Sequence, residues 1–169
     1  MARPTRLPGF SYIGRHQYFL TFCTLYGQPL LADPAVDEWV RAQLLQSSTV
    51  HGMAVDTYSV MPDHVHLLVK GITASADLQD FMIHLKRETG WRFRRERKRH
   101  LWQEGFHDRI LRDESEAMHF AAYIVGNGVS EGLSASIETC PRWGSFTRSR
   151  DQILRMIGMA GVRANDRRG

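Results

Sequence analysis

Two histidines separated by one residue are the side chains of this sequence best suited to bind a metal ion. His64 and His66 lie in the stretch MPDHVHLLVKG, residues 61–71. Side chains alternate between the two faces of a strand, so both imidazoles point the same way, together with Leu68. Two imidazoles held on a rigid strand can bind one cation. The pair alone names neither the metal nor a reaction, and two surface histidines on an edge strand would have the same pattern.

A tyrosine and an asparagine one helical turn apart could supply the chemistry that the histidines lack. Tyr123 and Asn127 lie in EAMHFAAYIVGNGV, residues 116–129, whose apolar pattern predicts a helix. Residues four apart share one helix face. A phenol forms a covalent phosphodiester when it is in line with a phosphorus whose oxygens are polarised by a cation. The amide oxygen of Asn127 could complete a shell of two imidazoles, whereas simple core packing is the alternative role for Tyr123.

The positive charge of the chain is concentrated in one segment. Eight basic and two acidic residues between Lys86 and Arg99 give that segment a net charge of +6, so the rest of the chain carries −2 of the overall +4. Trp91 and Phe93 interleave the arginines, which suits a nucleic-acid strand, although a solvated helix face is the alternative. The residues that we expect to contact the DNA backbone are Lys86, Arg87, Arg92, Arg94, Arg95 and Lys98.

Residue patterns predict the elements that position these groups. Strands are expected over residues 16–25, 53–60 and 64–70, with a loop and a short strand in 101–111. Helices are expected over 33–50, with Asp33 as N-cap, over about 77–99, and from Asp113 or Glu114 to about Asn127. A short helix is expected near 148–159. This order predicts an α+β fold, a ferredoxin-like antiparallel sheet with helices packed on one face, plus a C-terminal extension.

Length and composition indicate how many domains the chain forms and whether it has a secretory or membrane segment. A chain of 169 residues with 43% hydrophobic residues suits one domain, expected over 1–147, with a C-terminal helix and basic tail over 148–169. The basic N-terminus lacks the apolar stretch of a signal peptide, and no uncharged run reaches the length of a membrane span. We therefore expect a cytoplasmic protein without a membrane partner.

Four motifs in this order resemble the REP-associated tyrosine transposases of the HUH single-tyrosine superfamily, relatives of the transposases of the smallest bacterial insertion sequences. They are MPDHVHLLVKG, FMIHLKRETGWRF, LWQEGFHDRIL and AAYIVGNGV, within about residues 9–146. The resemblance implies binding of Mg²⁺ or Mn²⁺ and cleavage of single-stranded DNA beside a hairpin, leaving a 5′-phosphotyrosine link and a free 3′-hydroxyl. It places His64 and His66 on the metal motif, Tyr123 on the nucleophile and Asn127 on the third ligand.

The chain departs from the family pattern just after the tyrosine. Asn-Gly-Val at 127–129 replaces the usual Asn-Pro-Val, and Ser130 and Glu131 stand where a basic residue is usual. Glycine loosens a helix end, so the placement of Asn127 is the part of the site that this departure affects. Both histidines, the tyrosine and the asparagine are present, and the resemblance therefore implies an active enzyme.

The expected partners are single-stranded DNA and DNA hairpins, bound by a monomer, with a dimer left open, at the bacterial nucleoid. Two other functions fit the same residues. A non-catalytic hairpin-binding regulator would need the basic segment but not Tyr123. A metal-dependent nuclease using activated water would need the histidines and leave no protein–DNA adduct. His119, one turn before Tyr123, is the only local candidate for a general base.

Overall fold

A five-stranded antiparallel sheet in the order β4-β1-β3-β2-β5 forms the centre of the computed structural model, which describes residues 9–166, with the backbone alone for 159–166. Its strands are β1 (Gln17–Cys23), β2 (Met53–Val60), β3 (His64–Gly71), β4 (His107–Leu111) and β5 (Trp143–Gly144). The helices are α1 (Pro34–Val50), α2 (Leu78–Arg97), α3 (Glu114–Ser130) and α4 (Arg150–Asp166), with short 3-10 turns η1 (Leu25–Gly27) and η2 (Leu30–Ala32). Within the described range, no helix is both long and apolar enough to cross a membrane.

Aspartates at the helix starts confirm the predicted elements. The side chain of Asp33 accepts a hydrogen bond from the backbone N–H of Ala35, and Asp77 and Asp113 cap α2 and α3 in the same way. Two predicted ends were wrong: α3 continues past Asn127 to Ser130, and α4 is longer than 148–159. The two-residue strand β5 was not predicted, since so short a segment carries no periodicity.

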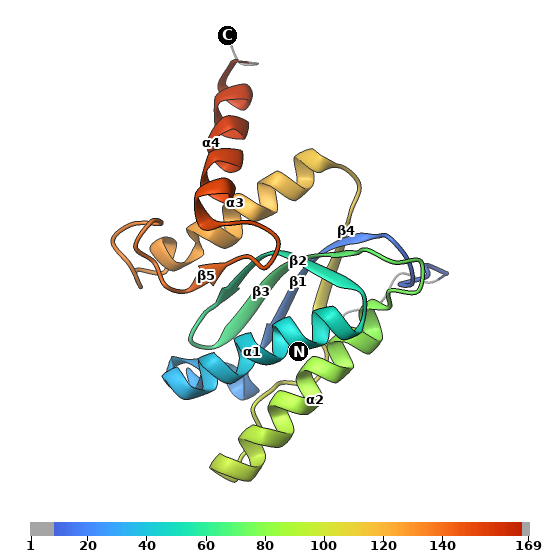
Figure 1. Cartoon of the computed structure of the whole chain (residues 1–169). Coiled ribbons are helices and arrows are strands. Elements are labelled where there is room, and N and C mark those ends of the chain that lie inside the picture. Colours follow the sequence, from blue (N-terminus) through green and yellow to red (C-terminus); the bar gives the residue numbers. More distant parts are fainter. Residues whose placement is uncertain (1–8, 167–169) are drawn as a thin grey trace.

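Helices cover both faces of the sheet, not one face as predicted. The α+β class and the ferredoxin-like strand order are confirmed, and α1 and α2 lie together on one face, while α3 lies on the other (Figure 1). Phe19 and Leu68 point toward α3 and form a second apolar cluster with its residues Ala117, Ala121 and Ile124. The small alanines allow the helix to approach the strands closely. A sheet with apolar side chains on both faces needs a helix on each.

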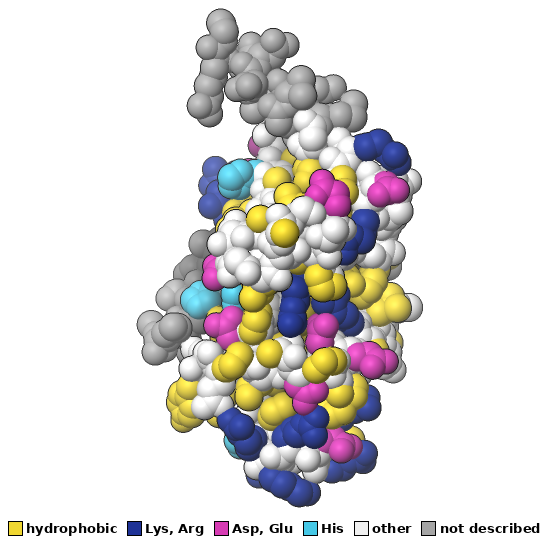
Figure 2. Space-filling model, turned by 90° about the vertical axis from the view of Figure 1, so that its left-hand side faces the viewer, with side chains coloured by type: hydrophobic (Ala, Val, Ile, Leu, Met, Phe, Trp, Pro, Cys, Tyr) yellow, Lys and Arg dark blue, Asp and Glu magenta, His cyan; other side chains and the backbone are white. Residues whose placement is uncertain are grey.

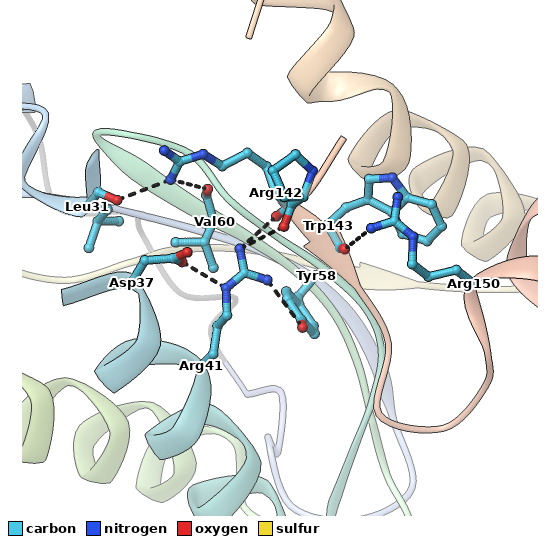
Figure 3. A network of polar contacts seen from close by, with 9 residues as sticks. Leu31, Asp37, Arg41, Tyr58, Val60, Arg142, Trp143 and Arg150 are labelled. Atoms are coloured by element: carbon cyan, nitrogen blue, oxygen red, sulfur yellow. Dashed lines mark hydrogen bonds and ion pairs between the residues drawn. The ribbon is translucent and has the colours of Figure 1, made fainter. Parts of the chain in front are cut away.

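The segment before α4 is fastened to the edge of the sheet by two arginines (Figure 3). Arg41 of α1 donates to the hydroxyl of Tyr58 at 3.3 Å and to the carbonyl of Pro141 at 3.2 Å. Arg142 donates to the carbonyl of Val60 at 3.3 Å, at the point where β2 ends. These bonds hold β5 beside β2. The predicted division at residue 147 stays a prediction, and α4 packs on α3.

Candidate active site

The histidine pair lies on the face of β3 that α3 covers. The ring centroids of His64 and His66 are 4.6 Å apart, and the side chains of their neighbours Val65 and Leu67 are buried in the core on the α1–α2 side. His66 is 6% exposed, whereas His64 is half-buried. The alternation expected for a strand therefore places both imidazoles together, as the sequence predicted.

Each histidine is oriented by a neighbouring polar side chain. Nδ1 of His64 lies 2.7 Å from Oδ1 of Asp63, and Nδ1 of His66 lies 2.8 Å from Oγ1 of Thr21 on β1. When Nδ1 carries the proton and donates it to these oxygens, Nε2 presents its lone pair. This is the arrangement by which proteins orient a histidine that binds a metal.

Burial controls the protonation of His66. The pKa of His66 is lowered from 6.5 to about 3, first by desolvation and then by the positive charge of a protonated His64, while the carboxylate of Asp63 acts in the opposite direction. The ring of His66 is thus neutral at neutral pH. A neutral imidazole is the form that binds metal ions.

Helix α3 brings Tyr123 and Asn127 to the same place. The ring of Tyr123 lies 5.3 Å from the ring of His66 between centroids and remains 48% exposed. The amide Nδ2 of Asn127 lies 3.4 Å from Nε2 of His64, and Asn127 is 5% exposed. The structure therefore brings together all four residues singled out from the sequence. The tyrosine faces solvent, where a strand of DNA could reach it, and the amide is enclosed. His119 is exposed one turn earlier and contacts the ring of Phe120.

The glycine after Asn127 does not loosen the helix. The backbone N–H of Glu131 donates to the carbonyl of Asn127, so the last turn of α3 is hydrogen-bonded through Gly128. A Cβ at Gly128 would lie 2.5 Å from Sγ of the buried Cys140. Glycine is required here because the segment before β5 packs directly on the helix backbone. The expectation of a loosened end was wrong.

The donor set fits a divalent cation. Among the side chains that the structure describes, those of residues 9–158, there is no group of three or more His, Cys, Asp and Glu side chains that could hold a metal ion. The two imidazoles and Asn127 make a different set. A half-turn of the amide of Asn127 would place its oxygen, a metal ligand, where Nδ2 lies beside His64. Two neutral imidazoles and one amide oxygen can together hold a metal and leave coordination positions for phosphate oxygens or water.

The basic residues of the predicted DNA interface lie elsewhere, on α2 and at its C-cap. They occupy the face of the sheet opposite Tyr123, and Lys and Arg side chains gather toward the lower end of the molecule, where α2 ends (Figure 2). Five of the six predicted residues are exposed: Arg87, Arg92, Arg94, Arg95 and Lys98. Lys86 differs, because its ammonium group donates to the carbonyls of Gln103 and Gly105 and burial lowers its pKa to about 8. A DNA contact by any of the six stays a prediction.

Thr21 and Asp63 were not among the site residues predicted from the sequence. Asp63 directly precedes His64, and an acidic residue beside a histidine pair is a signal that could have been used. Thr21 had no such signal, since only the antiparallel register of β1 with β3 places it opposite His66.

Comparison with known proteins identifies the family to which this chain is similar. Residues 12–127 match the family described as IS200-like transposases. The ISDra2 transposase TnpA of Deinococcus radiodurans is 33% identical over 78 residues, which are 46% of this chain and 54% of that protein. The chain thus spans about half the length of this curated relative.

Two solved structures share the fold. A REP-associated tyrosine transposase bound to a REP hairpin matches with a TM-score of 0.70 and 18% identity, over 85% of this chain and 82% of that one. A protein assigned as a transposase from Deinococcus radiodurans R1 matches with a TM-score of 0.51 and 25% identity, over 77% of this chain and 99% of the other. The family resemblance drawn from the four motifs is confirmed. With the match over residues 12–127, the chain belongs to the IS200-like transposase family.

Proposed function

We propose that this protein is a metal-dependent endonuclease and strand transferase that cuts single-stranded DNA at hairpins through a covalent 5′-phosphotyrosine intermediate. One observation supports this above all others. The ring centroid of Tyr123 lies 5.3 Å from that of His66, and the amide of Asn127 contacts His64 beside them. A half-exposed tyrosine next to two oriented imidazoles combines a nucleophile with a cation site. Neither core packing nor two surface histidines would require this arrangement.

The reaction follows from the position of the phenol. The oxygen of Tyr123 attacks the scissile phosphorus, a new P–O bond to the tyrosine forms, and the bond to the 3′-oxygen breaks. The phenol loses its proton to solvent, and the departing 3′-oxygen takes one up. Attack by a 3′-hydroxyl on the phosphotyrosine reverses these steps and joins a strand. Because the energy of the broken bond is kept in the new ester, strand joining requires no nucleotide cofactor.

His64, His66 and Asn127 are the residues that would hold the cation, Mg²⁺ or Mn²⁺. When bound, it would supply positive charge to the phosphate oxygens in the transition state. Asp63 and Thr21 keep the two rings in the orientation that this requires. The buried amide of Asn127 is held in place by α3, so few side chains have to be ordered when the DNA binds.

A DNA hairpin with a single-stranded flank is the substrate that we propose. The matching REP-associated transposase is known in complex with a REP hairpin, and this chain shares its fold. The exposed arginines of α2 offer charge for the phosphate backbone of such a substrate. Backbone contacts of this kind add affinity and carry no sequence information.

Denaturing gels test the proposal directly. The protein is mixed with a library of end-labelled hairpins that carry randomised single-stranded flanks, in the presence of Mn²⁺. A labelled fragment that migrates with the protein and disappears after protease treatment supports the transferase. Free labelled fragments alone would point to a nuclease using activated water. A shift on native gels without any cleavage would point to a hairpin-binding regulator.

A further inference from the structure

A cleft lies between α2 and the segment that follows it, away from Tyr123. Its volume is about 540 Å³, within the range of roughly 300–1,000 Å³ usual for small-molecule sites. One wall is α2, and the other is residues 100–106. We call it the α2 cleft. The proposed chemistry at Tyr123 assigns no role to it.

An exposed tryptophan stands at this cleft. Trp91 lines it and is 59% exposed, which is unusual for so large an apolar side chain. The guanidinium of Arg95 lies 4.8 Å from the centre of its ring. The facing wall is firm, because the indole N–H of Trp102 donates to Oγ1 of Thr89 at 2.8 Å. Gly90 also lines the cleft, and a Cβ there would meet Trp102 only at an ordinary 3.7 Å. A flat ring could therefore enter beside Trp91.

Positive charge surrounds the same opening. Arg87 and Arg94 line the cleft. Arg87 is paired with Glu88 at 2.9 Å, but among the side chains described, those of residues 9–158, the guanidinium of Arg94 has no hydrogen-bond or ion-pair partner. By contrast, Arg92 covers the ring of Trp39 and Arg97 pairs with Asp33. An arginine without a partner could bind the phosphate of a nucleotide, and an exposed indole could stack on its base.

The cleft is connected to the candidate active site through the sheet. The backbone N–H of Gln103, on its wall, donates to the carbonyl of Cys23 at 3.0 Å, and Cys23 is paired in register with His64. These two steps between neighbouring backbones separate the backbone of Gln103 from that of His64 by roughly 10 Å. A single strand passing round the end of β1 would join the cleft to the candidate active site.

We propose that the α2 cleft binds an unpaired nucleotide of the DNA substrate, with its base stacked on Trp91 and its phosphate beside Arg94. This inference rests on the proposed function, because the substrate proposed there includes a single-stranded flank. A base inside a duplex is already stacked on both faces and cannot enter. Stacking on an indole tolerates any base, so the cleft would hold the strand without reading its sequence.

Binding to two matched probes tests this directly. The first is a labelled oligodeoxyadenylate, and the second is an abasic oligomer of the same length, with the same phosphates and no bases. We expect wild-type protein to prefer the oligodeoxyadenylate about tenfold or more, from the usual effect of base stacking on an aromatic side chain. Trp91→Ala should abolish this preference, while Trp91→Phe should keep most of it. Gly90→Leu should abolish it by filling the cleft, and Gly90→Ala should not.

Arginine variants test the phosphate half of the inference. Arg94→Gln should weaken binding of both probes several-fold, because both carry phosphates. Arg92→Gln makes the same change of charge two residues away, outside the cleft, and should weaken them less. Thermal melting checks that each variant is folded, and little change is expected at the exposed positions 91 and 94.

The outcomes separate this inference from the proposed function. If Trp91→Ala and Gly90→Leu are folded and keep the wild-type preference, the cleft is not a base site, and the inference is overturned. The same holds if wild type shows no preference yet forms the Tyr123 adduct on hairpins, in which case the proposed function stands. A preference lost in both variants supports the cleft, even where no adduct forms and the proposed catalysis has failed.

Discussion

The amide Nδ2 of Asn127 lies 3.4 Å from Nε2 of His64, although the two residues are 63 positions apart in the chain and belong to α3 and β3. Asn127 is 5% exposed, so packing of the helix fixes where the amide lies. The imidazole is fixed from its other side by Asp63. The residues of the candidate cation site are thus held together before any ligand binds.

Replacing Asn127 by Ala should weaken Mn²⁺ binding about tenfold or more, because two imidazoles then remain as the only protein ligands. Isothermal titration of EDTA-treated protein with MnCl₂ measures the affinity. His119→Ala is the matched control, since this exposed histidine of α3 lies outside the proposed donor set. Equal affinities of wild type and Asn127→Ala would remove the asparagine from the site.

Replacing Tyr123 by Phe should abolish cleavage and the covalent adduct while hairpin affinity is kept. The change removes one hydroxyl from a half-exposed ring, so we expect the free energy of unfolding to change by no more than about 0.5 kcal/mol. Denaturing gels, native gels and urea unfolding measure the three properties. An adduct formed by the variant at the wild-type rate would place the nucleophile elsewhere.

The metal-free protein should lose stability in mild acid through His66. Its pKa is about 3 in the folded state and 6.5 ordinarily, so the unfolded state binds the extra proton first. The stability from this group is fully present above about pH 6.5 and falls as the pH drops toward 3, by at most about 1.4 kcal/mol per pH unit.

Urea unfolding in EDTA at pH 7 and at pH 5 measures this dependence. In His66→Asn, whose amide can still bond to Thr21, the fall between the two pH values should be clearly smaller than in wild type. The same fall in both proteins would show that burial does not keep His66 neutral.

Replacing Gly128 by Ala should destabilise the protein by about 1–3 kcal/mol, because the added Cβ meets Sγ of Cys140 at 2.5 Å. Gly126→Ala, on the same helix with nothing within 4 Å of its Cβ, should instead stabilise it by up to about 1 kcal/mol. Cys140→Ala in the Gly128→Ala background should recover part of the loss. Urea unfolding of the wild type and the three variants checks this, and equal stability of the two single glycine variants would contradict the packing described here.

Replacing both Arg94 and Arg95 by Gln should make DNA binding less dependent on salt. If both contact phosphates, the slope of log affinity against log salt becomes shallower by roughly two units at most, and by less on single strands. Anisotropy titrations over a range of NaCl concentrations measure the slope on hairpins with two different flanks. An unchanged slope would show that these arginines do not contact phosphates and only form a solvated helix face. If the variant lost affinity for a hairpin with only one of the two flanks, these arginines would contact base edges instead of phosphates.

Local periodicity was enough to predict the parts of the candidate site one at a time. The two-residue repeat of a strand places His64 and His66 on one face, and the spacing of four places Tyr123 and Asn127 on one side of a helix. The capping aspartate Asp33 marked where the first helix begins. These features depend on neighbours a few residues away, which a sequence displays directly.

Only the tertiary structure decided how those parts meet. Helix α3 packs on the histidine face of the sheet, while α2, which carries most of the basic residues of the segment 86–99, packs on the other, and no local pattern distinguishes the two faces. Thr21 reaches His66 through the register of β1 with β3, and Cys140 explains why Gly128 is needed. These contacts join residues distant in sequence. Which face of the sheet each helix covers depends on the packing of the whole chain. The free energy that stabilises this arrangement comes from burying both apolar faces of the sheet at the same time.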